Sequence, residues 1–359
     1  MGCMASAQRI GVSTGSSVSW PDTAGSKGET VVAALARLNK EISESERTYP
    51  AARLAVVTAE LESMQQEMNT FEELTTDLTK ESYAKTLHQM FVSLDLYRRP
   101  LLASENEDFI ANVNRKEMRR LELNWLRTRY SELQRERRGL HAQILRLRSL
   151  YTQQQLLLES LWGNDLRPGT AQESALTKAS ALRDALASVS AKLRAAAEYA
   201  HAAVRLLDDA LPAWKLTSVG KSGWERTASC GDACRLLVQA RCLERGARRV
   251  LAAPAAPRAA RTLRLALDYA FTDVMHDHKY ERATEVFVEF KEALVHLIES
   301  IHQVLLNNLE NLAVAEKDVA KCRRELQAAR VNAIVHKGLA ELKYEPKALT
   351  RLKMNANNR

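Results

Sequence analysis

The sequence predicts an all-α protein: an elongated antiparallel helical bundle of long, coiled-coil-like helices, preceded by a flexible N-terminal tail. Helix-forming residues dominate the 359-residue chain, which contains 13 glycines and 8 prolines. From Val31 onward, apolar residues recur every three or four positions, as they do along one face of an α-helix. No segment alternates convincingly between apolar and polar residues, so no sheet is expected.

Residues 1–30 are predicted to form a flexible, lipidated tether. Residues 7–30 are rich in Ser, Gly and Thr and show no apolar periodicity. Gly2 follows Met1, and Ser6 lies four positions later, which is the pattern of N-myristoylation. One myristoyl chain binds a membrane with only roughly 10⁴ M⁻¹, and a palmitoyl thioester on Cys3 would supply the second signal that stable anchoring needs. The alternative is a chance match in an ordinary frayed terminus.

An acidic helical region is expected over residues 31–110. Its first helix follows Val31, Leu35, Leu38 and Ile42 and stops near Pro50, because proline disfavours a helical conformation in the residue before it. A second helix continues with spacings that alternate between three and four, which is typical of a coiled-coil seam. The apolar positions of this seam are Leu54, Val57, Leu61, Met64, Met68, Phe71 and Leu78.

A long antiparallel helical hairpin is predicted over residues 111–211. Its first helix covers about 116–162, a length of about 70 Å at 1.5 Å per residue. The segment WGNDLRPGT then interrupts the apolar pattern, and Thr170 with Glu173 forms a capping-box pattern that starts the second helix. Because a tight turn joins two long helices, they are expected to lie antiparallel.

A loop, a second helical region and a basic tail are expected after the hairpin. Ser222 with Glu225 repeats the capping-box pattern where this helical region starts. The last helix has a wide apolar stripe near Phe287 and a narrower one later, which indicates burial at one end and a coiled-coil projection at the other. The expected bounds are 212–224 for the loop, 225–340 for the helical region ending in a long helix, and 341–359 for the basic tail.

Charge is segregated along the chain, which carries a formal net charge of +8. Residues 40–108 are acidic, residues 115–148 are strongly basic, and two further basic clusters cover 241–264 and 317–359. Such runs are often solvated faces, here with an acidic helix against a basic one. The functional interpretation is contact with an anionic surface, because each Lys or Arg near anionic lipid adds about 1 kcal/mol. The residues predicted for this contact are Arg115, Lys116, Arg119, Arg120, Arg127, Arg129, Arg135 and Arg138.

No catalytic, cofactor-binding or metal site is predicted, and the chain is not expected to be an enzyme. The segment VGKSG lacks the spacing of a phosphate-binding loop, because Lys215 stands where that loop has its first glycine. Cys230, Cys234 and Cys242 lack the second ligand pair of a structural zinc site. Buried small hydrophobic residues are therefore the better interpretation of these cysteines.

The segment DVMHDH, residues 273–278, places Asp273, His276 and Asp277 on one helical face. It lacks the pair of histidines one turn apart that a helical zinc site needs, so it is interpreted as a polar helix end or hinge. The tryptophans are expected to be packing anchors near helix seams or ends. These are Trp125, Trp162, Trp214 and Trp224.

These features favour a membrane-anchored helical scaffold or adaptor, N-myristoylated and palmitoylated, on the cytoplasmic face of a membrane, with the plasma membrane favoured. Its expected partners are an anionic membrane surface and a protein that packs on its helical seams, including a second copy of itself. The odd count of 5 cysteines, without an apolar secretory signal, indicates a reducing compartment.

The alternative is a soluble coiled-coil cytoskeletal or centrosomal adaptor in the cytoplasm, without lipid contact. Nucleic-acid binding is disfavoured, because the aromatic residues are not interleaved with the basic runs as single-strand binding requires. The scaffold and the adaptor differ in their dependence on Gly2, since only the scaffold should leave the membrane when Gly2 is changed to Ala.

Overall fold

The computed structural model describes residues 29–74, 89, 105–163, 167–220, 222–253 and 257–339. Helices account for nearly all of these residues and no strand occurs among them, which confirms the predicted all-α helical bundle. Gly2, Cys3, Leu78 and the tails predicted at 1–30 and 341–359 lie outside the described residues, apart from Glu29 and Thr30. The helices are α1 (Val31–Glu46), α2 (Pro50–Leu74), α5 (Glu107–Trp162), α6 (Thr170–Val219), α7 (Gly223–Leu251), α8 (Pro257–Asp273) and α9 (Asp277–His336).

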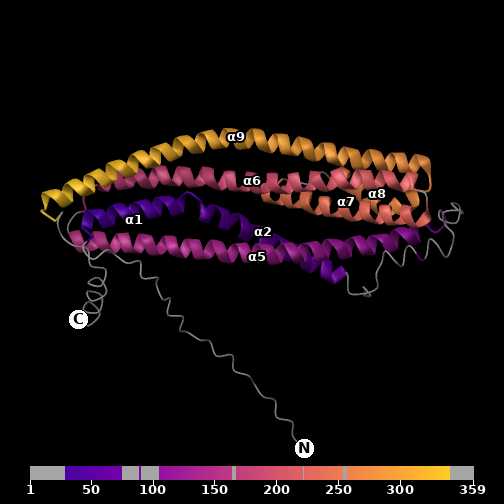
Figure 1. The fold of residues 1–359 in the computed structure, drawn as a ribbon, viewed down its shortest axis with the longest axis horizontal. Coiled ribbons are helices and arrows are strands. Elements are labelled where there is room, and N and C mark those ends of the chain that lie inside the picture. Colours follow the sequence, from indigo (N-terminus) through magenta and orange to yellow (C-terminus); the bar gives the residue numbers. More distant parts are fainter. Residues whose placement is uncertain are drawn as a thin grey trace, which may run out of the picture.

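Three long helices, α5, α6 and α9, run along the molecule and make the bundle elongated (Figure 1). Helix α5 has 56 residues and α9 has 60, so they span about 84 Å and about 90 Å at 1.5 Å per residue. Helix α6 runs in the opposite direction to both (Figure 1). The bundle is therefore elongated and antiparallel, as the apolar periodicity predicts.

Helices α5 and α6 run antiparallel but are held apart by other helices. Helix α5 packs on α1, α2, α7 and α8, whereas α6 packs mainly on α7 and α9. In Figure 1, α1 and the first part of α2 lie between α5 and α6 in one half of the molecule, and α2 then crosses α5. In the other half, α7 lies between α5 and α6. An apolar seam specifies that a helix packs, but it does not specify on which neighbour.

The loop expected over residues 212–224 is mostly helical, and this prediction was wrong. Helix α6 continues through Pro212 to Val219. A proline inside a helix removes a backbone hydrogen bond and costs about 3 kcal/mol. Burial beyond it offsets that cost: Trp214 is 1% exposed, donates from Nε1 to Thr284 Oγ1 at 2.8 Å, and packs edge-on against Phe287.

The two predicted capping boxes have different outcomes. The Ser222 side chain accepts from the Glu225 backbone N–H at 3.1 Å and caps α7, as predicted. The prediction for Thr170 was wrong, because the N-cap of α6 is Gly169 in the left-handed region at φ +86°. A Cβ at Gly169 would lie 2.9 Å from Leu326 Cδ1, so glycine is favoured here by both conformation and space.

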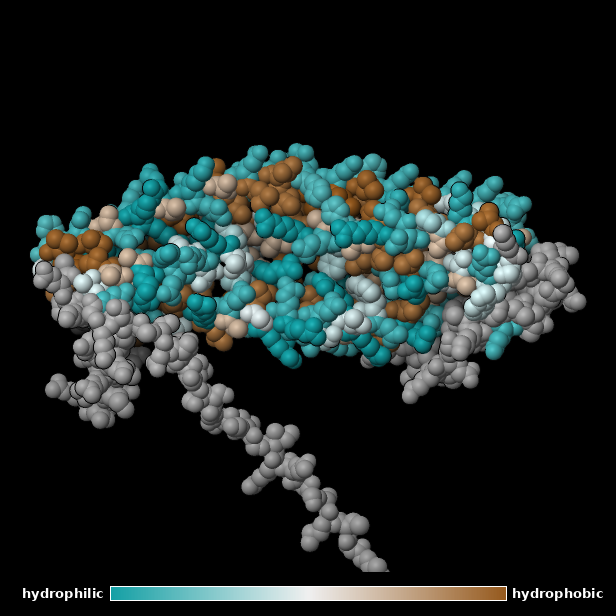
Figure 2. Space-filling model, in the orientation of Figure 1, coloured by the Kyte–Doolittle hydropathy of each residue, from teal (hydrophilic) through white to brown (hydrophobic). Residues whose placement is uncertain are grey.

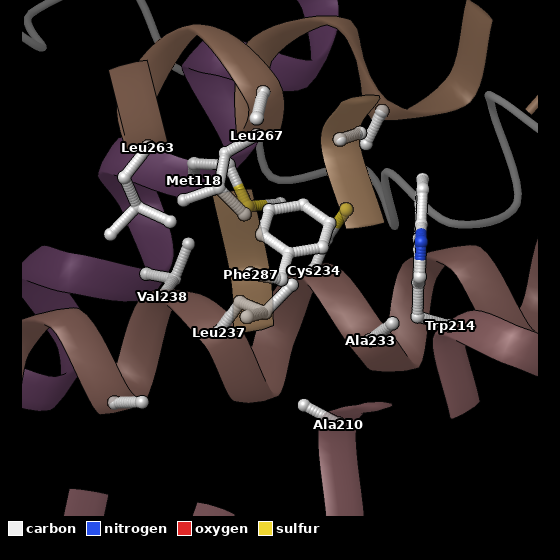
Figure 3. Packing of buried hydrophobic residues seen from close by; sticks show 14 of the residues in the cluster. Met118, Ala210, Trp214, Ala233, Cys234, Leu237, Val238, Leu263, Leu267 and Phe287 are labelled. Atoms are coloured by element: carbon white, nitrogen blue, oxygen red, sulfur yellow. The ribbon is translucent and has the colours of Figure 1, made fainter. Parts of the chain in front are cut away.

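The largest core lies where α6, α7, α8 and α9 meet the first part of α5. Phe287 of α9 is fully buried and lies beside Cys234 and Leu237 of α7 (Figure 3). Leu267 of α8 and Met118 of α5 close the same cluster. The facing surfaces of α6 and α7 are rich in buried alanine, which lets the two helices approach closely.

The three cysteines of α7 belong to this core, as the sequence predicts. Cys230, Cys234 and Cys242 are all buried. Burial raises the pKa of the Cys242 thiol to about 11 and that of Cys230 well above its ordinary value. These two thiols are therefore protonated at neutral pH and pack as small apolar groups.

At the opposite end of the bundle, α1 packs against the ends of α5 and α9. Val31, Leu35, Leu38 and Ile42 are buried there, which confirms the first predicted apolar stripe. Their neighbours are Leu150, Leu157, Leu158 and Trp162 of α5 and Ile334 of α9. The described chain therefore begins at the end of the molecule where α5 and α9 finish.

Candidate functional site: the basic surface of α5

Three of the eight cations predicted to contact an anionic surface form ion pairs inside the molecule. Arg115 Nε donates to Asp268 Oδ2 at 2.9 Å, and this hydrogen bond raises the pKa of the guanidinium. Arg120 Nε donates to Glu117 Oε2 at 2.6 Å. Arg129 pairs with Glu132 at 3.0 Å and also donates to the Tyr199 hydroxyl at 2.9 Å. These three side chains have intramolecular counter-charges and are less available to a partner.

The other predicted cations face solvent. Lys116, Arg127, Arg135 and Arg138 are exposed, and Arg119 is half-buried. Within the described part of the chain, no ion pair involves Lys116, Arg119, Arg135 or Arg138. Their positive charge is therefore uncompensated by the residues that the structure describes.

The same helix continues with further exposed arginines. Between positions 127 and 148 the only carboxylates of α5 are Glu132 and Glu136. Glu132 pairs with Arg129, and Glu136 accepts from Arg53 Nε of α2 at 2.6 Å. The remaining cations leave the outer side of α5 strongly positive over about 32 Å of helix. We define the α5 basic surface as Arg127, Arg135, Arg138, Arg146 and Arg148, all of which are exposed.

The segment that carries Gly2 and Cys3 joins the bundle close to the last part of α5. Thr30 caps α1, because its Oγ1 accepts from the Ala33 N–H at 3.3 Å. Helix α1 then packs on the end of α5 through Leu35 and Leu38. The lipidation predicted at Gly2 and Cys3 falls outside the described residues. The chain enters the bundle at Thr30, close to the end of α5.

A second charged cluster is partly buried between α2, α5 and α7, and its arginines belong to the basic cluster 241–264. Glu122 of α5 accepts from Arg241 and lies 3.2 Å from Arg245 Nη2. Glu67 of α2 pairs with Arg245 at 3.1 Å and also with Arg249. We call the set Glu60, Glu67, Glu122, Arg241, Arg245 and Arg249 the charged seam.

The charged seam contains ionisable groups whose charges are strongly influenced by burial. Burial disfavours the charged form of Arg245, but Glu122, Cys242 and Glu67 outweigh burial and raise the pKa of the guanidinium. Burial raises the pKa of Glu60 to about 7, against the attraction of nearby arginines. Glu60 Oε1 also has no hydrogen-bond partner among the described residues.

The spacing of charged residues in the sequence contains a signal for the charged seam. Arg241, Arg245 and Arg249 are spaced by four and share one face of α7, while Glu60 and Glu67 are one heptad apart on α2. The acidic helix α2 lies against the basic helix α7 here, as one interpretation of the charge runs expects. The contact is partly buried and not a solvated face.

The remaining candidate segment is a helix junction. Asp273 is the last residue of α8 and His276 is the N-cap of α9, so the predicted polar helix end is confirmed. Burial, partly opposed by Lys279, raises the pKa of Asp273 to about 7. Among the residues that the structure describes, no group of three or more His, Cys, Asp or Glu side chains is placed to hold a metal ion.

The predicted tryptophan anchors divide between core and surface. Trp214 and Trp162 are buried and Trp125 is partly buried, whereas Trp224 is 55% exposed at the start of α7.

Helices long and apolar enough to cross a bilayer are absent from the described part of the chain. Comparisons of the chain with models of protein families, with curated proteins and with solved structures found no match.

Proposed function

We propose that the protein is a membrane-anchored helical scaffold on the cytoplasmic face of a membrane, with the plasma membrane favoured. Acyl chains on Gly2 and Cys3 would supply the anchor, and the α5 basic surface would contact anionic lipid. The observation that carries the proposal is a set of exposed arginines on α5 that form no ion pair with another described residue: Arg135, Arg138, Arg146 and Arg148.

The magnitudes support a combined attachment. A single myristoyl chain gives roughly 10⁴ M⁻¹, which is marginal, and each Lys or Arg near an anionic surface adds about 1 kcal/mol. Three arginines therefore correspond to about 100-fold in affinity at low salt. The long bundle would display its helical seams to protein partners along a membrane-bound body.

Vesicle sedimentation tests the lipid contact of the full chain produced without acyl groups. Wild type should bind vesicles that contain phosphatidylserine and not neutral vesicles, and Arg135→Gln/Arg138→Gln/Arg146→Gln should reduce that binding about 100-fold. The matched control removes three exposed lysines elsewhere: Lys192→Gln/Lys317→Gln/Lys321→Gln. Equal losses for both triple variants would contradict a specific role for α5.

Fractionation of eukaryotic cells tests the anchor separately. Gly2→Ala blocks myristoylation and Cys3→Ser blocks thioester formation, so each should move the protein from the membrane fraction to the soluble fraction. A terminal peptide of wild type should carry a myristoyl mass and a second acyl mass that hydroxylamine removes. Retention of Gly2→Ala on membranes, with an unmodified terminus in wild type, would refute the anchor.

One observation favours the alternative of a soluble coiled-coil adaptor. Helix α9 exposes Val288, Val295, Leu306 and Val314, with 38%, 37%, 60% and 57% of their surfaces accessible. Figure 2 shows hydrophobic patches along the part of the molecule that α9 occupies. These side chains could pack on a partner helix or on a second copy, and an adaptor of this kind would keep its location in the Gly2→Ala variant.

A further inference from the structure

A large cleft that several charged side chains line lies near the end of the bundle where α5 and α9 finish. It has a volume of about 890 Å³ and is lined by residues of α1, α5, α6 and α9 and by Arg167, which precedes α6. Ligand sites for small molecules commonly have volumes of about 300–1,000 Å³. Five cations line it: Lys40, Arg167, Arg323, Arg324 and Arg330. The cleft is separate from the α5 basic surface.

Arg330 is the buried cation of this cleft, and its charge is poorly compensated. The residue is 6% exposed, and its one ion pair among the described residues is with Glu173 at 3.5 Å. The Glu173 side chain is itself 47% exposed. Burial disfavours the charged form of Arg330 more than Glu173 favours it, so the pKa of this guanidinium is lowered.

A neighbouring buried arginine, Arg183, has its positive charge compensated by two carboxylates. The Arg183 side chain is 9% exposed, pairs with Glu46 and Asp184 at 2.7 Å each, and has a raised pKa. Arg183 is thus neutralised by the protein, whereas Arg330 is buried at a comparable depth with one longer contact. The difference points to a missing anion beside Arg330.

The rest of the lining has the chemistry of an anion site. Arg324 is exposed at the cleft and forms no ion pair with another described residue, and the carboxylates that line the cleft are Glu173 and Asp184. The N-terminus of α6 adjoins it, because Gly169 lies against Leu326 and Ala329, just before Arg330 on α9. Gly169 provides no side-chain cap, and a helix N-terminus favours negative charge.

Neutral polar groups complete the lining. Thr177 and Ser180 of α6 and Gln327 of α9 all face the cleft, and their hydroxyl and amide groups can hydrogen-bond to hydroxyl groups of a ligand. Three of the five cations, Lys40, Arg167 and Arg323, already pair with Glu44, Glu159 and Glu46. Arg324 and Arg330 therefore remain for a ligand, together with the N-terminus of α6, and two cations match a ligand with more than one negative charge. Guanidinium groups match phosphate oxygens in geometry as well as in charge.

We propose that this cleft binds a multiply phosphorylated polyol, such as an inositol that carries several phosphate groups, with Arg330 at its base and Arg324 at its rim. The ligand is either a free metabolite or the headgroup of a phosphorylated inositol lipid. The proposal does not rest on the anchor or on the α5 basic surface, because a free ligand needs neither.

Calorimetric titration of the full-length, unacylated chain tests binding. Inositol hexakisphosphate and inositol trisphosphate should bind, whereas unphosphorylated inositol and sulfate at matched ionic strength should not. Arg324→Gln, at the exposed rim, and Arg330→Gln should each weaken binding about 10- to 100-fold. Arg194→Gln/Arg205→Gln, at two exposed positions of α6 outside the cleft, is the matched control and should leave binding unchanged.

Thermal unfolding separates a binding role of Arg330 from a structural one. Without ligand, Arg330→Gln should melt at the same or a higher temperature than wild type, because it removes a poorly compensated buried charge. Added inositol hexakisphosphate should raise the melting temperature of wild type but not that of the variant. A lower melting temperature of the variant, together with unchanged ligand binding, would overturn the assignment.

Competition between vesicles and free inositol hexakisphosphate distinguishes a lipid headgroup from a soluble ligand. Vesicles that contain phosphorylated inositol lipid should bind the Arg146→Gln/Arg148→Gln chain, and free inositol hexakisphosphate should release it, if the headgroup is the ligand. Binding of the free compounds without vesicle binding supports the soluble ligand. No binding of any phosphorylated compound by wild type would refute the cleft, whatever the outcome for phosphatidylserine vesicles. An equal loss of binding in the Arg194→Gln/Arg205→Gln control would refute it as well.

Discussion

Replacing Glu60 by Gln should stabilise the protein at alkaline pH and have little effect at acid pH. Glu60 lies in the charged seam, is 4% exposed, and has an Oε1 atom without a hydrogen-bond partner among the described residues. Arg129, Arg249 and Arg53 attract its negative charge, but burial outweighs them and raises its pKa to about 7. Gln has nearly the same volume and cannot ionise, so the substitution isolates the charge.

The magnitude follows from the difference between the folded and unfolded pKa values of Glu60. The ordinary value is 4.5 and the folded value is about 7. Between these values the folded chain keeps a proton that the unfolded chain has released, so stability falls as the pH rises from 4.5 to 7. At about 1.4 kcal/mol per pH unit, ionised Glu60 costs the folded state about 3 kcal/mol above pH 7.

Urea unfolding followed by circular dichroism at pH 4.5 and pH 8 measures this difference. The Glu60→Gln variant should exceed wild type by about 3 kcal/mol at pH 8 and by less than about 1 kcal/mol at pH 4.5. Glu62→Gln, at an exposed position of the same helix, is the matched control and should show no such dependence. A Glu60→Gln variant that is less stable than wild type at pH 8 would contradict an unfavourable charge at this position, since Glu60 would then be a favourable ion-pair partner.

Three further predictions address packing, backbone and the α8–α9 junction. Trp214→Ala removes a side chain that is 1% exposed and should lower the free energy of unfolding in urea by about 3–5 kcal/mol. Gly169→Ala places an L side chain at φ +86° and should cost about 1–2 kcal/mol, whereas Gly139→Ala, in open space within α5, should gain about 1 kcal/mol; effects of the same sign would contradict the assignment of Gly169. Asp273→Asn should melt above wild type at pH 8 but not near pH 3.8, because burial raises the pKa of Asp273 from 3.8 to about 7; a pH-independent difference would speak against that shift.

The sequence predicts the helices well because their apolar spacing reflects burial directly. Leu35, Leu38 and Ile42 keep helical spacing, and all three are buried. The helix ends are harder, because they depend on contacts distant in the chain. Helix α6 passes Pro212 with Trp214 packed against α9. A Cβ at its N-cap, Gly169, would lie 2.9 Å from Leu326 Cδ1 of α9, so that side chain would have to shift.

The candidate site could be predicted only as a set of cations on one helix. Arg115 and Arg135 look equivalent in the sequence, yet Arg115 meets Asp268, which is 153 positions away in the chain. Arg135 remains exposed without an ion pair among the described residues. Whether a charge is compensated depends on tertiary contacts, which single-sequence periodicity does not contain.

Among the described residues, several arginines lie where carboxylates of the protein do not pair with them. In the charged seam, Glu67 and Glu122 lie against the arginines of α7, and at Arg183 two carboxylates lie within 2.7 Å. Arg135, Arg138 and Arg146 on α5 and Arg324 at the cleft have no such ion pair among the described residues, and Arg330 has one contact, at 3.5 Å. Exposed arginines on α5 remain hydrated and are suited to a diffuse anionic surface, where salt weakens the contact. A buried guanidinium has lost its water and gains most from a defined anion, so the two regions call for different partners.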